Sequence, residues 1–102
     1  MWHPPTFSLR NDHLFFQGDF IFKTVGRAWV TLHAMMKQMD AHKVTVDLSQ
    51  VQRVDSAGLA LLLALLREVI QRGKSLHFVH IPDKMHALAV VAGVEDILFK
   101  HI

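Results

Sequence analysis

The chain has no cysteine, and its charges of opposite sign nearly balance. Without cysteine, disulfide bonds, thiolate catalysis and cysteine-based zinc sites are excluded, which fits a reducing compartment such as the cytoplasm. Eleven lysines and arginines stand against nine acidic residues, and no run of five basic residues occurs. Nucleic acid is therefore not expected as a partner, because its binding needs a concentrated basic face.

Long apolar runs are missing as well. The longest, Gly58–Leu66, falls far short of the roughly 20 residues that a membrane-spanning helix needs. Met1–Pro5 lacks the basic and apolar regions of a secretion signal. We therefore expect a soluble, cytoplasmic protein that does not insert into a membrane.

The chain does have enough apolar side chains to build one core. Of its 102 residues, 51% are hydrophobic and 20% are charged. This composition predicts a single domain over residues 1–102, with residues 1–5 as a loose lead-in.

Alternating and periodic hydrophobic residues predict the elements of the N-terminal half. Thr6–Leu9 and His13–Gln17 read as the strands of a hairpin, the second ended or bulged by Gly18-Asp19. A helix is predicted over Thr24–Asp40, with Thr24 as its N-cap. Its apolar stripe, which includes a tryptophan as core anchor, comprises Val25, Ala28, Trp29, Leu32, Met35, Met36 and Met39.

The C-terminal half alternates strands with helices. Val44–Leu48 reads as a central strand, because apolar residues lie on both of its faces. A helix is predicted over Ser56–Arg72, with Gly73 directly after its end. A strand, a helix and a final half-turn or strand follow at Leu76–His80, Met85–Ala92 and Glu95–Phe99.

This order of elements predicts the fold class. Strands separated by helices indicate parallel neighbours joined by right-handed crossovers. We therefore predict an α/β fold. It has a mixed four- to five-stranded sheet with an N-terminal hairpin, and three to four helices mainly on one face.

The tetrapeptide Asp55-Ser56-Ala57-Gly58 lies where the predicted central strand passes into the Leu-rich helix. The first N–H groups of a helix lack partners within the helix, and the helix dipole is positive there. Asp55 or Ser56 can accept hydrogen bonds from these groups, and Gly58 permits close backbone approach. The turn is either a well-capped helix start or a contact site for an anion or a partner.

The helix after this turn is apolar on more than one side. Its predicted core stripe consists of Leu59, Leu62, Leu63, Leu66 and Ile70, with Val69 at the edge. Leu61 and Leu65 lie off that stripe, where a water-facing helix would carry polar residues. Either they form an exposed patch that binds a partner, or another element of the domain covers them. An exposed flank would also let two copies of the chain pair when the partner is absent.

The stretch VDLSQVQRVDSAGLALLLALL, with FFQGDF upstream, resembles the STAS domain, the fold of the anti-sigma-factor antagonists. The resemblance covers nearly the whole chain. FFQGDF looks like the second strand of the family, and DLS…VDSAG looks like its third strand and signature loop. The nearest likeness is to MlaB-type members, to which the PDKMHALAVVAGVEDIL segment is also similar.

This resemblance implies a non-catalytic interaction module. MlaB-type proteins are cytosolic subunits of the ABC transporter that moves phospholipids between Gram-negative membranes, and so maintains outer-membrane lipid asymmetry. They bind and regulate its ATPase, and so lie at the inner membrane through the ATPase and the permease. By position, the implied partner-binding residues are Asp55, Ser56, Ala57, Gly58, Leu59 and Leu62.

A second branch of the family gives an alternative. MlaB-type proteins more often carry Thr-Gly where this chain has Ser56-Ala57, and Ser-Ala also fits the anti-sigma-factor antagonists. In those proteins the matching serine is phosphorylated by a kinase that is also the anti-sigma factor. The resemblance therefore also implies a phosphorylation switch at Ser56, with that kinase as partner.

The remaining polar residues suggest no catalytic, cofactor or metal site. The eight histidines are dispersed, and His77 and His80 are expected on opposite faces of a strand. Asp47 and Asp55 flank one turn, but no nucleophile and base accompany them. We expect Asp47 to brace the turn, and we expect neither enzyme activity nor a cofactor.

Overall fold

The computed structural model describes residues 3–99 and contains one four-stranded sheet in the order β1-β2-β3-β4. β1 and β2 pair antiparallel as a hairpin, whereas β2–β3 and β3–β4 pair parallel. The predicted mixed sheet and N-terminal hairpin are confirmed, with four strands and four helices. In chain order the elements are β1 (Thr6–Arg10), β2 (His13–Phe20), α1 (Val25–Met36), β3 (Lys43–Val54), α2 (Ser56–Gln71), β4 (Ser75–Val79), α3 (Asp83–Ala92) and α4 (Glu95–Phe99).

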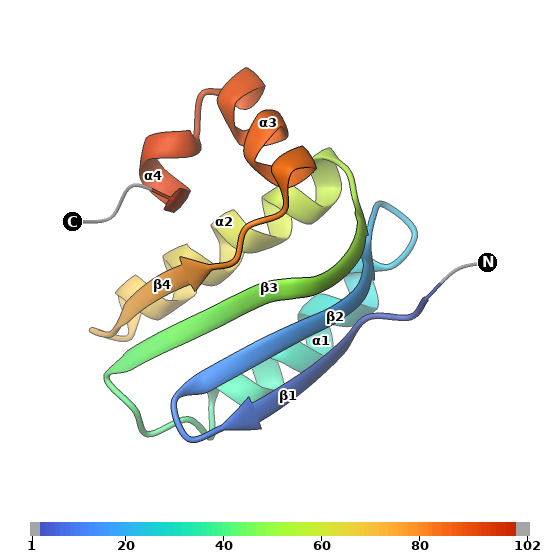
Figure 1. Ribbon diagram of the computed structural model, residues 1–102. Coiled ribbons are helices and arrows are strands. Elements are labelled where there is room, and N and C mark those ends of the chain that lie inside the picture. The colour runs from blue at the N-terminus through green and yellow to red at the C-terminus, as the bar shows by residue number, and fades with distance from the viewer. Residues whose placement is uncertain (1–2, 100–102) are drawn as a thin grey trace.

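Figure 1 shows α1 and α2 side by side on one face of the sheet, with α3 and α4 beyond α2 near the β4 edge. The core lies between that face and the helices. Strands β2 and β3 contribute Leu14, Phe16, Val46 and Leu48, and α1 contributes Leu32, all fully or almost fully buried. No helix within the described range 3–99 is long and apolar enough to cross a membrane.

Strand β3 is longer than the alternating pattern predicts. It continues past Leu48 to Val54, and the added half pairs with the end of β2 through two register shifts. Such bulges insert extra residues and turn side chains out of the regular alternation. Because of these bulges, the second half of the strand lacks the alternation of apolar and polar residues by which a strand is predicted.

Helix α1 is shorter than predicted and begins differently. It ends at Met36 instead of Asp40, and Thr24 makes no capping hydrogen bond with its side chain. The Thr24 hydroxyl instead donates to the Asp19 carbonyl oxygen (2.7 Å) and accepts the Ile21 N–H (3.1 Å). Thr24 therefore closes the turn between β2 and α1.

Helix α2 is buried on two sides, which decides between the alternatives for its flank. Leu61 and Leu65 are only 5% and 1% exposed, so another element of the domain covers them. Leu61 and Leu65 therefore do not themselves form an exposed patch, and pairing of two copies of the chain stays a prediction. Ile70, predicted in the core, is 59% exposed and lies in the lining of an open apolar pocket beside Ile97 of α4.

The segment before β1 is anchored where a loose lead-in was predicted. The Asp19 N–H donates to the His3 carbonyl oxygen (2.8 Å), and the His3 N–H donates to Asp19 Oδ2 (2.9 Å). These bonds hold residues 3–5 across the end of β2. Residues 1 and 2 lie outside the described range.

Candidate functional site

Asp55 caps helix α2. Its backbone is extended, and Oδ1 accepts the N–H groups of Ala57 (2.9 Å) and Gly58 (3.2 Å). Of the two capping residues that the sequence allowed, the structure selects Asp55. The cap satisfies free N–H groups of the first turn without using Ser56.

The second oxygen of the same carboxylate reaches a different element. Asp55 Oδ2 accepts the N–H of Phe22 (3.0 Å), in the loop between β2 and α1. Phe22 is 82% exposed. The contact joins residues 33 positions apart, so the motif alone could not have indicated that Phe22 belongs to the site.

Gly58 brings α2 directly against the end of the sheet. A Cβ atom at this position would lie 2.1 Å from the Phe20 carbonyl oxygen and 2.9 Å from a methyl group of Val54. The predicted close approach at Gly58 is therefore confirmed. Only glycine lets the helix begin here without displacing β2.

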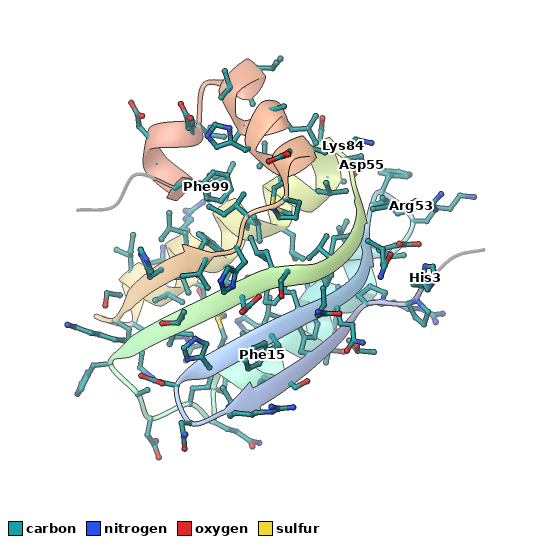
Figure 2. All side chains as sticks on the ribbon, in the orientation of Figure 1. His3, Phe15, Arg53, Asp55, Lys84 and Phe99 are labelled. Carbon is teal, nitrogen blue, oxygen red and sulfur yellow. The ribbon has the colours of Figure 1, made fainter. Side chains whose placement is uncertain are left out.

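Ser56 is the exposed first residue of α2. Within residues 3–99, its hydroxyl has no recorded hydrogen-bond partner, because Asp55 supplies the cap. Figure 2 shows Asp55, Arg53 and Lys84 at the same end of the molecule. Ser56 thus presents a free hydroxyl at the positive end of a helix.

An apolar groove runs from this turn between α1 and α2. Its lining residues are Phe22, Val25, Gly26, Trp29, Ala57, Ala60, Leu61 and Ala64. Trp29, predicted as a core anchor, is half-buried and forms part of the groove wall. Alanines along α2 keep the groove floor low, so an apolar side chain from outside can approach the helix closely.

Burial limits which predicted site residues can touch a partner. Leu59 and Leu62 are 4% and 1% exposed, and Gly58 is buried. The Leu59 and Leu62 side chains support the turn from beneath. Ser56 is exposed, and Asp55 and Ala57 are half-buried, so these three are accessible. The partner-binding role of the six-residue set stays a prediction.

Asp47 braces the uncovered face of the sheet. Its Oδ1 accepts the Ser49 N–H (2.8 Å), at one of the bulges, and its Oδ2 lies 2.9 Å from His80 Nδ1. Burial alone would raise the pKa of Asp47, but hydrogen bonds from Ser49 and His80 outweigh it and lower the pKa below 3.8. Asp47 therefore ties β3 to the end of β4.

His80 is not part of a strand, contrary to the prediction. β4 ends at Val79, and His80 adopts a left-handed backbone (φ 55°) that turns its ring towards Asp47. Among the described residues, no group of three or more His, Cys, Asp or Glu side chains could hold a metal ion.

The family model for the MlaB STAS domain matches residues 6–100 of the chain. The chain belongs to the STAS domain family. Asp55–Gly58, the residues whose sequence resembles the signature loop of this family, form the start of α2.

Comparison with curated proteins and solved structures points to relatives of one kind. The anti-sigma-B factor antagonist of Staphylococcus epidermidis is 30% identical over 63 residues, which cover 62% of this STAS chain and 58% of the relative. The unphosphorylated anti-sigma factor antagonist SpoIIAA has a TM-score of 0.70 at 12% identity, with 89% of this chain and 82% of that chain covered. The phosphorylated form, described as a Bacillus cell fate determinant, has a TM-score of 0.66 at 13% identity, over 88% and 84% of the two chains. These structures share the STAS fold.

Proposed function

We propose that this STAS domain is a non-catalytic module that binds a partner protein through the start of α2. The carrying observation is the exposed Ser56, whose hydroxyl is free while Asp55 supplies the cap. The apolar groove beside it adds Phe22 and Trp29 as aromatic contacts. Aromatic side chains in and around such grooves commonly contribute most to binding energy.

The partner that we propose is the cytosolic ATPase of a phospholipid-transporting ABC transporter. The match to the MlaB family model over nearly the whole chain supports this choice. The domain would bind the ATPase from the cytoplasm, regulate it, and stay at the inner membrane through the permease. The groove would receive apolar side chains of the ATPase, and Ser56 would lie at the edge of the contact.

A second candidate function is that of an anti-sigma-factor antagonist switched by phosphorylation of Ser56. The curated relatives are described as anti-sigma-B factor antagonists, and the exposed Ser56 hydroxyl is accessible to a kinase. A phosphate adds about −1.5 to −2 charges. The N-terminus of α2 would tolerate this charge. An acidic partner surface would be repelled by it, and an apolar one would strip the phosphate of its hydration at a cost in free energy. Phosphorylation would then release the partner without unfolding the domain.

Co-purification from native cells tests both functions. The chain is tagged, extracted in mild detergent, and compared with the variants Ser56→Arg and Ser75→Arg. Ser75 is an exposed serine at the start of β4, so Ser75→Arg adds the same charge away from the site. Leu59→Glu is unsuitable, because it would bury a charge in the core.

The transporter function predicts that wild type and Ser75→Arg recover an ABC ATPase with its permease, and that Ser56→Arg loses both. A soluble kinase, with phosphate found on Ser56, would instead establish the antagonist function. Recovery of the same partner by all three proteins would contradict a binding surface at Ser56.

A further inference from the structure

Asp19, at the end of β2, is a completely buried carboxylate that the partner surface does not include. Its Oδ2 accepts the His3 N–H (2.9 Å) and lies 3.4 Å from Arg53 Nε. Within residues 3–99, its Oδ1 has no hydrogen-bond partner, and His3 Nδ1 lies 3.8 Å away. A buried charge is costly, so a side chain kept in this state calls for a structural or functional reason.

The first consequence of Asp19 is to hold the segment before β1. Its backbone N–H and its carboxylate form a reciprocal pair of hydrogen bonds with the backbone of His3. Gly18 makes room for this crossing: a Cβ there would lie 2.3 Å from the Pro4 carbonyl oxygen. Residues 3–5 thus form a strap across the end of β2.

The main chain of Asp19 holds the loop that carries Phe22 directly, and this contact does not depend on the carboxylate. The carboxylate acts on the loop through the strap, because Pro4 and Pro5 line one pocket together with Lys23 and Thr24 of the loop. The Asp19 carbonyl oxygen accepts the Thr24 hydroxyl, which in turn accepts the Ile21 N–H. The next N–H along the chain, that of Phe22, donates to Asp55 Oδ2. Hydrogen bonds therefore lead from the strap through Asp19 and the loop to the cap of α2.

The ion pair between Asp19 and Arg53 connects the end of β2 to the end of β3, and so completes a closed set of contacts around the loop. Arg53 lies two residues before Asp55 on the same strand end, and the Asp55 N–H also reaches the Phe20 carbonyl oxygen (3.4 Å). Figure 2 shows His3 and Arg53 neighbouring each other at the end of the molecule that carries Asp55. Asp19 thus contacts both chain segments that meet at the site.

We propose that Asp19 is a positioning residue for the partner surface. With the strap of residues 3–5, it fixes the loop at residues 20–24, and this places Phe22 beside Ser56. The inference rests on the proposed function, because it assumes that Phe22 contacts the partner. Loss of the Asp19 carboxylate would leave Ser56 and the main-chain bond to Thr24 in place. It would free the strap and Arg53, and so loosen the loop that positions Phe22.

Amide hydrogen exchange on the full chain tests the positioning without any partner. Asp19→Ala removes every contact of the carboxylate, whereas Asp19→Asn keeps its shape and removes its charge. Asp12→Ala is the control, since Asp12 is an exposed acid beside a histidine in the β1–β2 turn. We expect the Phe22 amide to exchange about tenfold faster in Asp19→Ala, less so in Asp19→Asn, and unchanged in the control. Amides of central β3, such as Val46, should keep their wild-type rates.

Unchanged exchange at Phe22 in both Asp19 variants would overturn the proposal. A uniform rise in the exchange rates of all amides would also overturn it, because Asp19 would then stabilise the whole domain. If Asp19→Ala does not fold, the exchange rate of the Phe22 amide in Asp19→Asn decides whether the proposal holds.

Partner recovery then separates this inference from the proposed function. Asp19→Asn should lower recovery of the co-purifying ATPase or kinase, and Ser56→Arg should abolish it. If Ser56→Arg recovers as much partner as wild type, the proposed function is contradicted. The exchange rate of the Phe22 amide would still decide whether Asp19 positions the loop. Full recovery with Asp19→Asn, despite faster exchange at Phe22, would refute the link between Phe22 and binding.

Discussion

One carboxylate holds the candidate site together at the scale of single residues. Asp55 uses one oxygen to cap α2 and the other to hold the Phe22 backbone. The Asp55 carboxylate is therefore engaged in hydrogen bonds within the domain. Its neighbour Ser56 carries the exposed polar group.

Replacing Asp55 separates its two roles. Asp55→Ala should lower the free energy of unfolding by about 0.5–2 kcal/mol, the usual range for a lost N-cap. Asp55→Asn should recover the part of that loss due to the cap, because asparagine caps helices about as well. It should not recover the bond to Phe22, because its amide NH2 cannot accept a hydrogen bond. Urea unfolding of the three proteins measures the difference. Equal stability of Asp55→Ala and wild type would show that the cap contributes nothing.

The sequence predicts residue roles well when the contacts are local. The Asp55 cap spans two and three residues, and the close approach of Gly58 follows from its place in the turn. Phe22 and the strap at His3 were missed, because their contacts join residues 33 and 16 positions apart. Such pairs become visible only when the strand register is known.

At the scale of elements, α2 illustrates the limit of a helical stripe. A single stripe assigns Leu65 to the surface and Ile70 to the core, whereas their exposures are 1% and 59%. The stripe assumes one buried face, but α2 lies between α1 on one side and α3 and α4 on the other. Periodicity identifies the helix, and its neighbours decide which faces are buried.

Two alanine substitutions in α2 measure this difference. Leu65→Ala should cost about 2–5 kcal/mol of unfolding free energy, as is usual for a buried leucine. Ile70→Ala removes a largely exposed side chain, so its cost should stay within about 0.5 kcal/mol of zero. Thermal or urea unfolding gives both values. A larger loss for Ile70→Ala than for Leu65→Ala would contradict the burial described here.

The edge hairpin and the parallel strand pairs of the sheet were predicted, but the length of β3 was not. Residues 49–53 are mostly polar and exposed, and the bulges disrupt their alternation. Their sequence is typical of a loop, although these residues pair with β2. This extension matters for the site, because it carries the chain to Val54 and places Asp55 at the end of the sheet.

At the scale of the whole molecule, two buried acids make the fold sensitive to low pH. The His3 backbone hydrogen bond holds the pKa of Asp19 below 3.8, although burial opposes it. Asp47 also has a lowered pKa, since its hydrogen bonds outweigh its burial. A lowered pKa in the folded state means that the unfolded chain binds protons first as pH falls. The stability from both acids is thus complete above about pH 5 and declines below the ordinary aspartate pKa.

Unfolding experiments at several pH values test this dependence. The free energy of unfolding should fall between about pH 5 and pH 3 in wild type, and less steeply in Asp47→Asn. Asp12→Asn serves as control, because that acid is exposed in a turn. The same slope in wild type and Asp47→Asn would show that Asp47 does not contribute to acid sensitivity.

The contact of Gly58 with Phe20 also has a consequence for assembly. The two residues belong to α2 and β2, so the signature turn reaches its final geometry only after β2 and β3 have paired. A chain still folding cannot display Ser56 and Phe22 together. Under the proposed function, a partner that contacts both residues would bind only the folded domain.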